Sequence, residues 1–338
     1  MTDVMSKTMI NIKDVAVAIV FNQQGQFLLG QRPEGKPYAG YWEFPGGKLE
    51  AGESVWQALC RELDEELGIQ PQTGTPWVTR VYTYPHATVR LHFWRVTAFA
   101  GEPRGREGQA FTWTCMQPTA VDAFAGLPQP LLPASLPVLR WLALPRYVVL
   151  SHAAAWGVQP FLQACEARFQ QTACPWLLLR EPALAEADLF ELYDGLRALC
   201  EAYQVPLSVS SRHVNLLATR QVNSPLHYTA RDVAALGAEL TPRTDADAMC
   251  IWRGASCHTA AELAQLADWD VDYAFLGNVQ ATASHPGQTG MGWATWQTEV
   301  TGCPVPTYAI GGMTLGDLPQ ALAAGGQGVA LQRGYWEA

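Results

Sequence analysis

The stretch GGKLEAGESVWQALCRELDEELGI, residues 46–69, combines four glycines with six acidic side chains. Its second half has helical spacing, because apolar residues recur every three or four positions: Val55, Ala58, Leu59, Leu63 and Leu67. Ser54 predicts the N-cap of this helix, and Gly68 predicts a left-handed cap at its end. We therefore expect a helix between two glycine-containing loops.

The acidic side chains of this helix are crowded on one face. Glu62, Glu65 and Glu66 stand at positions i, i+3 and i+4, where like charges repel. One interpretation is a solvated acidic face. The other is a site for a hard divalent cation such as Mg²⁺, which prefers carboxylate oxygens and bridges substrate phosphates. Glu53 and Arg61 can orient these carboxylates through a salt bridge.

The order Gly47, Glu53, Arg61-Glu62-Leu63, Glu65-Glu66 and Gly68-Ile69 fills every fixed position of GX₅EX₇REUXEEXGU, where U is aliphatic. This pattern resembles the Nudix box. The resemblance implies an α/β/α sandwich and Mg²⁺-dependent hydrolysis of a nucleoside diphosphate linked to another moiety, with Mn²⁺ as a substitute. The catalytic residues that it implies are Glu53, Arg61, Glu62, Glu65 and Glu66. The implied metal site comprises Gly46, Glu62, Glu65, Glu66 and Glu107.

The resemblance extends over about residues 12–142 to the MutT branch, which hydrolyses 8-oxo-dGTP to the monophosphate and pyrophosphate. It is carried by Gln31-Arg32, by WEFPGGK (42–48), by LHFW (91–94), and by GEP (101–103) followed by EGQ (107–109) and Trp113. It implies that Arg32 and Phe44 contact the nucleotide and that Glu107 adds a carboxylate to the metal site.

The sequence departs from this branch at PASLP, residues 133–137. The branch usually has an Asn there, which reads the oxidised purine with a donor and an acceptor. Ser135 offers a single, shorter hydroxyl. Loss of a two-point reader removes about 1–3 kcal/mol of discrimination. We therefore expect Ser135 to contact the substrate. We expect discrimination between bases to be weaker than in the branch, whereas the hydrolysis itself does not depend on this position.

The chain length predicts two domains. A chain of 338 residues with 49% hydrophobic residues can form two cores. A segment rich in Pro and Leu at 124–146 includes a short expected helix at 138–143 and ends in a linker at Leu144-Pro145. The expected domains are 1–144 and 145–338. In the first, we predict strand pairs 15–21 with 26–29 and 78–84 with 89–96, and a short strand at 111–114.

The second part predicts a (β/α)₈ barrel. Eight β-type runs alternate with helical segments such as 184–202 and 260–267. The runs are 147–151, 176–180, 207–211, 226–229, 249–254, 273–277, 307–312 and 328–332. In such barrels the site lies at the C-terminal ends of the strands.

Residues 146–335 resemble the thiamine phosphate synthase and TenI thiazole tautomerase superfamily. The motifs are Arg180-Glu181, Leu226-His227 before Asp232, GASCH (254–258) and AIGG (309–312). The resemblance implies a phosphate-bearing ligand of the thiamine pathway and the site residues Arg180, Asp232, His258, Gly311 and Gly312. The glycine pair after the seventh strand suits an anion site.

The synthase pattern is incomplete in this barrel. Ser210-Ser211 stand where the synthase has Asn-Asp, and its loop Lys aligns near His285. His258 matches a residue that tautomerases use for proton transfer, although a structural histidine fits as well. The barrel is therefore either an altered thiamine-pathway enzyme or a module that binds a phosphate ligand without catalysis.

Composition narrows the function further. A net charge of −9 argues against a general nucleic-acid surface, and no run approaches a membrane span. Eight scattered cysteines suggest reduced thiols in a cytoplasmic protein. The leading hypothesis is a nucleoside triphosphate diphosphatase acting on 8-oxo-dGTP. The alternative is a thiamine-pathway enzyme whose Nudix half acts on thiamine diphosphate or another nucleotide. The oligomeric state is not predicted.

Overall fold

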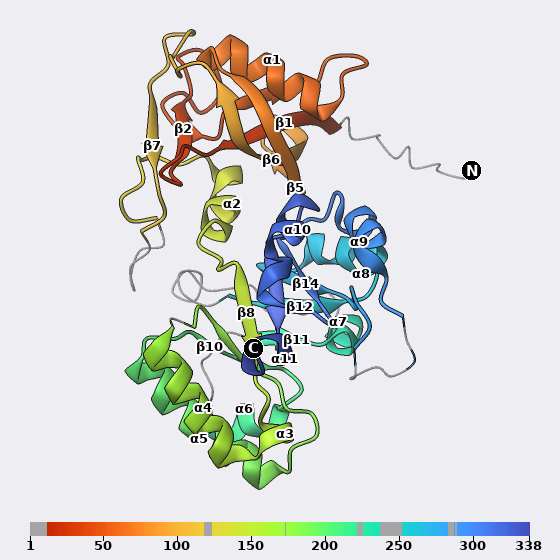
Figure 1. The fold of residues 1–338 in the computed structure, drawn as a ribbon. Coiled ribbons are helices and arrows are strands. Elements are labelled where there is room, and N and C mark those ends of the chain that lie inside the picture. Colours follow the sequence, from red (N-terminus) through yellow and green to blue (C-terminus); the bar gives the residue numbers. More distant parts are fainter. Residues whose placement is uncertain are drawn as a thin grey trace, which may run out of the picture. The chain divides into compact units, whose positions relative to one another are not determined.

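The computed structural model describes residues 12–117, 124–172, 174–221, 226–236, 252–282, 287 and 289–338. These residues form two compact units (Figure 1). The first includes the described residues up to Leu139, and the second begins at Arg140 and also takes in Phe124 and Ala125. Both units are of the α/β class, as the sequence predicts.

The first unit contains two small sheets. One has the strand order β4 (Gly46–Lys48), β1 (Ile12–Val20), β6 (Ala87–Ala100) and β5 (Gln70–Tyr84). The other has the order β3 (Trp42–Glu43), β2 (Phe27–Gln31) and β7 (Phe111–Thr114). In the first sheet β1 runs parallel to β6 and antiparallel to β4. The pairing of β5 with β6 confirms the predicted antiparallel pair.

The predicted pairing of residues 15–21 with 26–29 holds only at the turn. The Asn22 N–H donates to the Gln26 carbonyl at 3.0 Å, and Phe21 forms one antiparallel bridge with Phe27. Beyond this bridge β1 and β2 enter different sheets. Short apolar runs flanking a polar turn identify both strands, but their sheet partners include β6 and β7, which lie far away in the chain.

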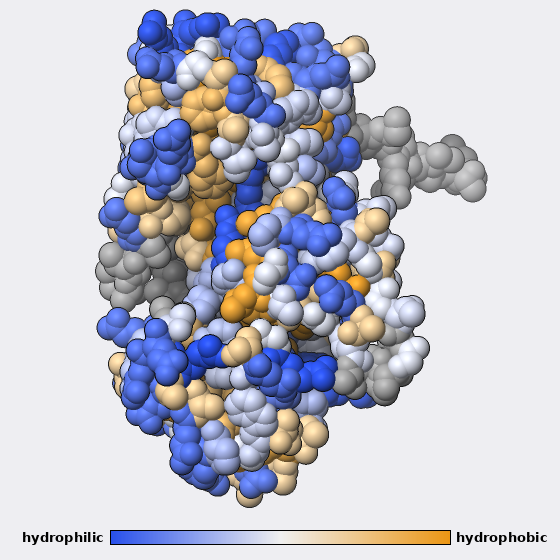
Figure 2. Space-filling model, viewed as in Figure 1, coloured by the Kyte–Doolittle hydropathy of each residue, from blue (hydrophilic) through white to orange (hydrophobic). Residues whose placement is uncertain are grey.

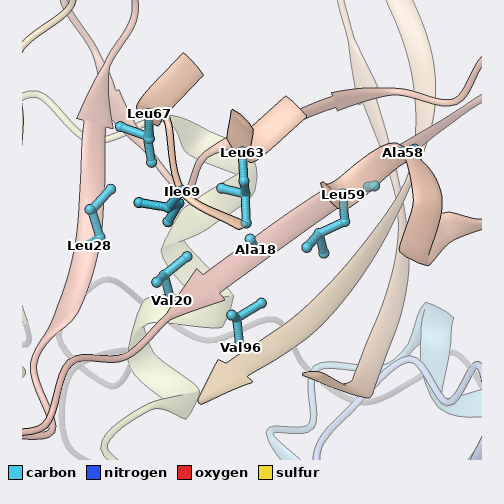
Figure 3. Packing of buried hydrophobic residues seen from close by; sticks show 10 residues of the cluster. Ala18, Val20, Leu28, Ala58, Leu59, Leu63, Leu67, Ile69 and Val96 are labelled. Atoms are coloured by element: carbon cyan, nitrogen blue, oxygen red, sulfur yellow. The ribbon is translucent and has the colours of Figure 1, made fainter. Parts of the chain in front are cut away.

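Helix α1 (Val55–Leu67) carries the crowded acidic residues. The Ser54 hydroxyl accepts from the Gln57 N–H, and Gly68 closes the helix in the left-handed conformation at φ 69°. Figure 3 shows how Leu59, Leu63 and Leu67 of α1 point toward the core residues of β1, β2 and β6. The opposite face of the helix is polar, and hydrophilic residues cover this end of the unit in Figure 2.

The predicted helix at 138–143 is shifted toward the N-terminus. The described residues after β7 include the 3₁₀ turn η1 (Pro133–Ser135), which is followed directly by α2 (Leu136–Trp141). Pro133 occupies the first turn, where its missing N–H costs no hydrogen bond.

The second unit is a closed barrel of eight parallel strands, in agreement with the sequence. The strands are β8 (Tyr147–Leu150), β9 (Leu177–Leu179), β10 (Leu207–Ser210), β11 (Leu226–Tyr228), β12 (Gly254–Cys257), β13 (Tyr273–Leu276), β14 (Thr307–Ile310) and β15 (Gly328–Leu331). Pairing of β15 with β8 closes the ring.

The predicted strand at 249–254 is misplaced. Residues 249–251 lie outside the described residues, and the observed strand β12 begins at Gly254. Gly254 pairs with Tyr273 of β13, and a Cβ at Gly254 would lie 2.0 Å from the Tyr273 ring, so this position takes a residue without a side chain. Small residues in β12 make room for large rings inside the barrel, whereas sequence reasoning followed the apolar run before it.

Helices cover the barrel and connect its strands. They are α3 (Ala153–Trp156), α4 (Val158–Gln171), α5 (Glu186–Ala202), α6 (Val214–Arg220), α7 (Ala230–Leu236), α8 (Ala260–Gln265), η3 (Leu266–Asp268), α9 (Gly292–Val300), η4 (Leu315–Asp317), α10 (Leu318–Ala323) and α11 (Arg333–Trp336). Among the described residues, no helix combines the length and apolar character that crossing a membrane requires. The seven described cysteines are free thiols.

Candidate active site

Arg61 is the centre of a salt-bridge network on α1. Its guanidinium makes two bonds to Glu53, from Nε at 2.8 Å and from Nη2 at 3.0 Å. Nη1 reaches Glu62 at 2.9 Å and Glu65 at 3.2 Å, and Nη2 donates to the Lys48 carbonyl at 3.0 Å. The hydrogen bonds from Arg61 lower the pKa of Glu53 to about 2. The salt bridge expected between Glu53 and Arg61 is therefore present, and it fixes the start of the acidic face.

Glu62 is held against the glycine loop. A Cβ at Gly47 would lie 2.1 Å from its carboxylate carbon, so only glycine leaves room for this group. Burial raises the pKa of Glu62, although the neighbouring Arg61 opposes the shift. Gly47, the first glycine of the box pattern, therefore leaves the space that the Glu62 carboxylate occupies.

Glu66 lies one turn further along the same face. Its Oε2 accepts a hydrogen bond from the Gly46 N–H at 3.2 Å. Gly46 has φ 143°, and a Cβ there would lie 2.1 Å from the Ala16 carbonyl oxygen. Burial raises the pKa of Glu66 to about 8, and the nearby carboxylates of Glu62, Glu43 and Glu107 add to the shift.

One pocket of about 610 Å³ in the first unit collects most of the predicted residues. Those that line it are Arg32, Phe44, Gly46, Glu62, Glu66, Glu107 and Ser135. Glu53, Arg61 and Glu65 are not part of the lining. The Glu65 side chain is 55% exposed and is paired with Arg61. The structure therefore brings two of the three helix glutamates to the pocket and places the third beside it.

The predicted substrate contacts differ in their surroundings. The Phe44 ring is buried and packs 5.9 Å from Phe27 and 6.2 Å from Phe93, measured between ring centroids. Ser135 is also buried, and within the described residues its hydroxyl makes no hydrogen bond to the protein. This hydroxyl is available to a ligand in the pocket.

Sequence reasoning missed Glu43, although it stands next to Phe44 in the motif. The Glu43 carboxylate faces the pocket and binds the Arg32 guanidinium. Burial raises its pKa, and Arg32 opposes this shift. Arg32 also donates from Nε to the Pro37 carbonyl at 2.8 Å. Lys36, another missed residue of the lining, lies 3.2 Å from Glu107.

A second pocket of about 610 Å³ lies in the barrel unit. Four of the predicted barrel residues line it: Arg180, His258, Gly311 and Gly312. Burial lowers the pKa of Arg180, with a further contribution from Arg212. The His258 ring is exposed, and its Nδ1 lies 3.3 Å from the Gly277 carbonyl oxygen.

Asp232 is separate from the other barrel candidates. It does not line this pocket, and its carboxylate accepts bonds from the Ser211 hydroxyl at 2.5 Å, the Thr229 hydroxyl at 2.7 Å and the Thr229 N–H at 3.1 Å. All three bonds reach Oδ2 and help to start α7. The residue aligned with the synthase lysine, His285, lies outside the described residues.

Comparison with known proteins covers both units. The NUDIX domain family matches residues 12–142, and the thiamine monophosphate synthase family matches residues 146–334, more than half of the chain. The chain belongs to both families. Its first unit is a Nudix hydrolase.

Relatives of the Nudix unit include two bacterial enzymes. An 8-oxo-dGTP diphosphatase of Haemophilus influenzae is 43% identical over 112 residues, covering 33% of this chain and 81% of the relative. A CTP pyrophosphohydrolase of Escherichia coli is 41% identical over 124 residues, covering 37% of this chain and 87% of the relative. A solved thiamine phosphate pyrophosphorylase from Pyrococcus furiosus is 18% identical, with a TM-score of 0.43, and covers 57% of this chain and 88% of its own.

Nudix hydrolases generally use divalent metal ions, and the Nudix pocket suits one. Four carboxylates line it, from Glu43, Glu62, Glu66 and Glu107, and three of them raise the pKa of Glu66. Such mutual repulsion is relieved by a hard cation bound to carboxylate oxygens. Within the described residues, no group of three or more His, Cys, Asp or Glu side chains is already arranged to hold a metal ion. Glu62 is held by Arg61 and Glu66 by Gly46.

Proposed function

We propose that the Nudix unit hydrolyses a nucleoside triphosphate to the monophosphate and pyrophosphate, with 8-oxo-dGTP as its main substrate. The observation that carries this proposal is the single pocket that combines Glu62, Glu66 and Glu107 with Phe44 and Ser135. The similarity to an 8-oxo-dGTP diphosphatase at 43% identity supports the choice of substrate. The physiological role would be removal of oxidised guanine nucleotides.

The carboxylates of Glu62, Glu66 and Glu107 would hold the metal, together with the Gly46 backbone and Glu65. Mg²⁺ is the expected ion, with Mn²⁺ as a substitute, and it would neutralise the diphosphate and lower the pKa of bound water. The chain itself orients Glu62 through Arg61 and Gly47, and Glu66 through Gly46. A pocket carboxylate accepts the proton of the attacking water. The proton is shared within the carboxylate cluster, because clustered carboxylates titrate together.

A second candidate substrate is a cytidine triphosphate. The relative named CTP pyrophosphohydrolase is 41% identical, nearly as similar as the first. Ser135 supplies one hydroxyl where two-point reading of a purine needs a donor and an acceptor. Base selectivity is therefore the part of the proposal that needs direct measurement.

For the barrel we propose binding of a phosphate-bearing small molecule by Arg180, His258, Gly311 and Gly312. Their shared pocket supports this proposal, because the neighbouring Glu181 carboxylate accepts from the Ala153 and Ala154 N–H groups and the partly buried Arg180 forms no salt bridge among the described residues. Asp232 does not line this pocket, which argues against a synthase-like metal site within it. We also propose that the domains are 1–144 and 145–338 and that the protein acts in the cytoplasm.

The decisive experiment measures pyrophosphate release with Mg²⁺ from 8-oxo-dGTP, dGTP, CTP, the other nucleoside triphosphates and thiamine diphosphate. Wild type is compared with Glu66→Gln and with Asp64→Asn, a control whose carboxylate lies on the same helix but pairs with Arg106 at 3.1 Å. We expect preference for 8-oxo-dGTP, lost in Glu66→Gln and kept in Asp64→Asn. Equal rates on all nucleotides would refute the substrate, and faster thiamine diphosphate cleavage would favour a thiamine-pathway role.

A further inference from the structure

Besides the buried rings of Phe44 and Phe93, three more accessible aromatic rings line the Nudix pocket, and the hydrolytic machinery does not use them. Tyr38, Tyr84 and His86 all belong to the lining, as do the carboxylates of Glu43 and Glu66. The Tyr38 and Tyr84 ring centroids are 5.5 Å apart, and those of Tyr84 and His86 are 5.4 Å apart with stacked planes. Tyr38 and His86 are 6.3 Å apart. The three rings therefore form one continuous aromatic wall.

Two separate segments build this wall. Tyr84 ends β5 and His86 lies in the turn to β6, whereas Tyr38 lies in the connection between β2 and β3. Packing of the core does not require these ring contacts, because Tyr84 is only half-buried and His86 is exposed. Planar rings that stay accessible in a pocket suit a planar ligand group.

The connection that carries Tyr38 is fixed in place. Tyr38 has φ 63°, a conformation that residues other than glycine rarely adopt. Arg32 holds both sides of it, because its Nε donates to the Pro37 carbonyl at 2.8 Å and its carbonyl accepts from the Gly40 N–H at 2.9 Å. Strained residues held by surrounding hydrogen bonds concentrate at ligand sites.

The chemistry of the pocket divides between its two kinds of lining. The carboxylates, with a cation bound to them, suit the phosphates of a nucleotide. They do not repel a neutral nucleobase, but they offer it no apolar surface. Aromatic side chains stack on bases of any type, because every base has a π-face. Ser135 has one hydroxyl with which to read the base edge. Most of the affinity for the base must then come from stacking.

We propose that Tyr38 and Tyr84, with His86 beside them, form the nucleobase platform of this enzyme. The proposal rests on the proposed function for the nucleotide class but concerns different residues. Tyr38 and Tyr84 contact the base and set affinity for the nucleoside part, largely without regard to base identity. Arg32 acts as a positioning residue, since it orders the segment that presents Tyr38.

Matched variants separate the wall from its surroundings. Tyr82 contacts Tyr84 with ring centroids 4.6 Å apart, and Tyr41 contacts Tyr38 at 5.3 Å, yet neither lines the pocket. Each wall residue therefore has a tyrosine control in its own segment. Tyr84→Phe keeps the ring and removes only the hydroxyl.

The test measures binding to the full-length protein by calorimetry, with Mg²⁺ present, of dGMP, dCMP and tripolyphosphate, which has no base. Tyr84→Leu and Tyr38→Leu are each expected to weaken dGMP and dCMP binding about 10-fold and to leave tripolyphosphate binding unchanged. Tyr84→Phe, Tyr82→Leu and Tyr41→Leu are expected to bind all three ligands like wild type.

Three results would overturn the platform: no binding of dGMP or dCMP by wild type, unchanged binding in Tyr38→Leu and Tyr84→Leu, or equal weakening of tripolyphosphate binding. Pyrophosphate release is assayed separately on the same proteins. A wild type that binds nucleotides through Tyr84 but hydrolyses none would refute the proposed function alone. Active Tyr84→Leu with an unchanged KM for every nucleotide would refute the platform alone.

Discussion

The carboxylate of Glu62 occupies the space beside Gly47 so closely that a Cβ on residue 47 would lie 2.1 Å from its carboxylate carbon. A methyl group on residue 47 must therefore displace the carboxylate, because the backbone of β4, which contains Gly47, is fixed by its antiparallel pairing with β1.

Gly47→Ala is expected to lower kcat at least 10-fold by moving Glu62, while the Tm of the unit changes little. Steady-state hydrolysis and thermal unfolding check this. A double-mutant cycle supplies the control, since Gly47→Ala should cost nothing further in a Glu62→Ala background. An additive loss in the double variant would mean that Gly47 acts independently of Glu62.

Arg61→Lys is expected to reduce activity 10- to 100-fold, as is typical when a group that orients metal ligands is changed. Lysine keeps the charge but cannot bond Glu53 at two points and reach Glu62 and Glu65 together. The measurement is kcat and the metal concentration for half-maximal rate. Arg106→Lys, an exposed arginine paired with Asp64 of the same helix, should stay within 2-fold. Equal losses in both variants would argue against orientation by Arg61.

Ser135→Asn is expected to raise the preference for 8-oxo-dGTP over dGTP by about 5- to 100-fold, because Asn adds a second hydrogen-bonding group. Ratios of kcat/KM for the two substrates give the answer. Ser135→Ala should change the ratio in the other direction or leave it flat. Identical ratios in all three proteins would place base reading elsewhere in the pocket.

The barrel is expected to lose stability as the pH falls from about 6.5. His227 is buried, with Nδ1 3.0 Å from the Tyr273 hydroxyl and Nε2 2.9 Å from the Ser256 hydroxyl. Burial lowers its pKa to about 3 in the folded protein. Between about pH 3 and pH 6.5 the His227 imidazole is protonated in the unfolded chain but not in the folded protein. The free energy of unfolding therefore rises with pH in this range, and acidification to pH 5 lowers it by about 2 kcal/mol.

Urea unfolding at pH 5, 6, 7 and 8 checks this expectation. His213 contributes in the same direction, because burial lowers its pKa to about 4. His227→Gln should therefore reduce the pH dependence without abolishing it. An unchanged pH dependence in His227→Gln would show that this imidazole is not the source.

Local signals predicted the helix with its acidic face. Ser54 and Gly68 mark its ends through their own backbone conformations, and Leu59, Leu63 and Leu67 define its buried stripe. These properties depend on residues within one turn of each other. The sequence therefore located the helix to within one residue of α1 and predicted Glu62, Glu65 and Glu66 on one face, of which Glu62 and Glu66 line the pocket.

Features that depend on distant partners were not predictable in the same way. The small residue at the start of β12 depends on the Tyr273 ring of β13, and the sheets that β1 and β2 join depend on β6 and β7. The pocket roles of Glu43, Tyr38 and Tyr84 arise where separate segments meet. The sequence alone carries no spacing signal for such meetings. The family resemblance supplied Arg32 and Glu107, which lie far from α1 in the chain.

The closure of the barrel by β8 and β15 has a consequence for synthesis of the chain. On one side Tyr147–Leu150 pairs with Gly328–Leu331. During synthesis, the first barrel strand therefore lacks this partner until the last strand has been translated. Within the part of the chain that the structure describes, the strands of the Nudix unit all precede residue 115. At the usual speed of translation, roughly 10 to 40 s separate the completion of the two units, and during that time the hydrolase can fold while the barrel is still open.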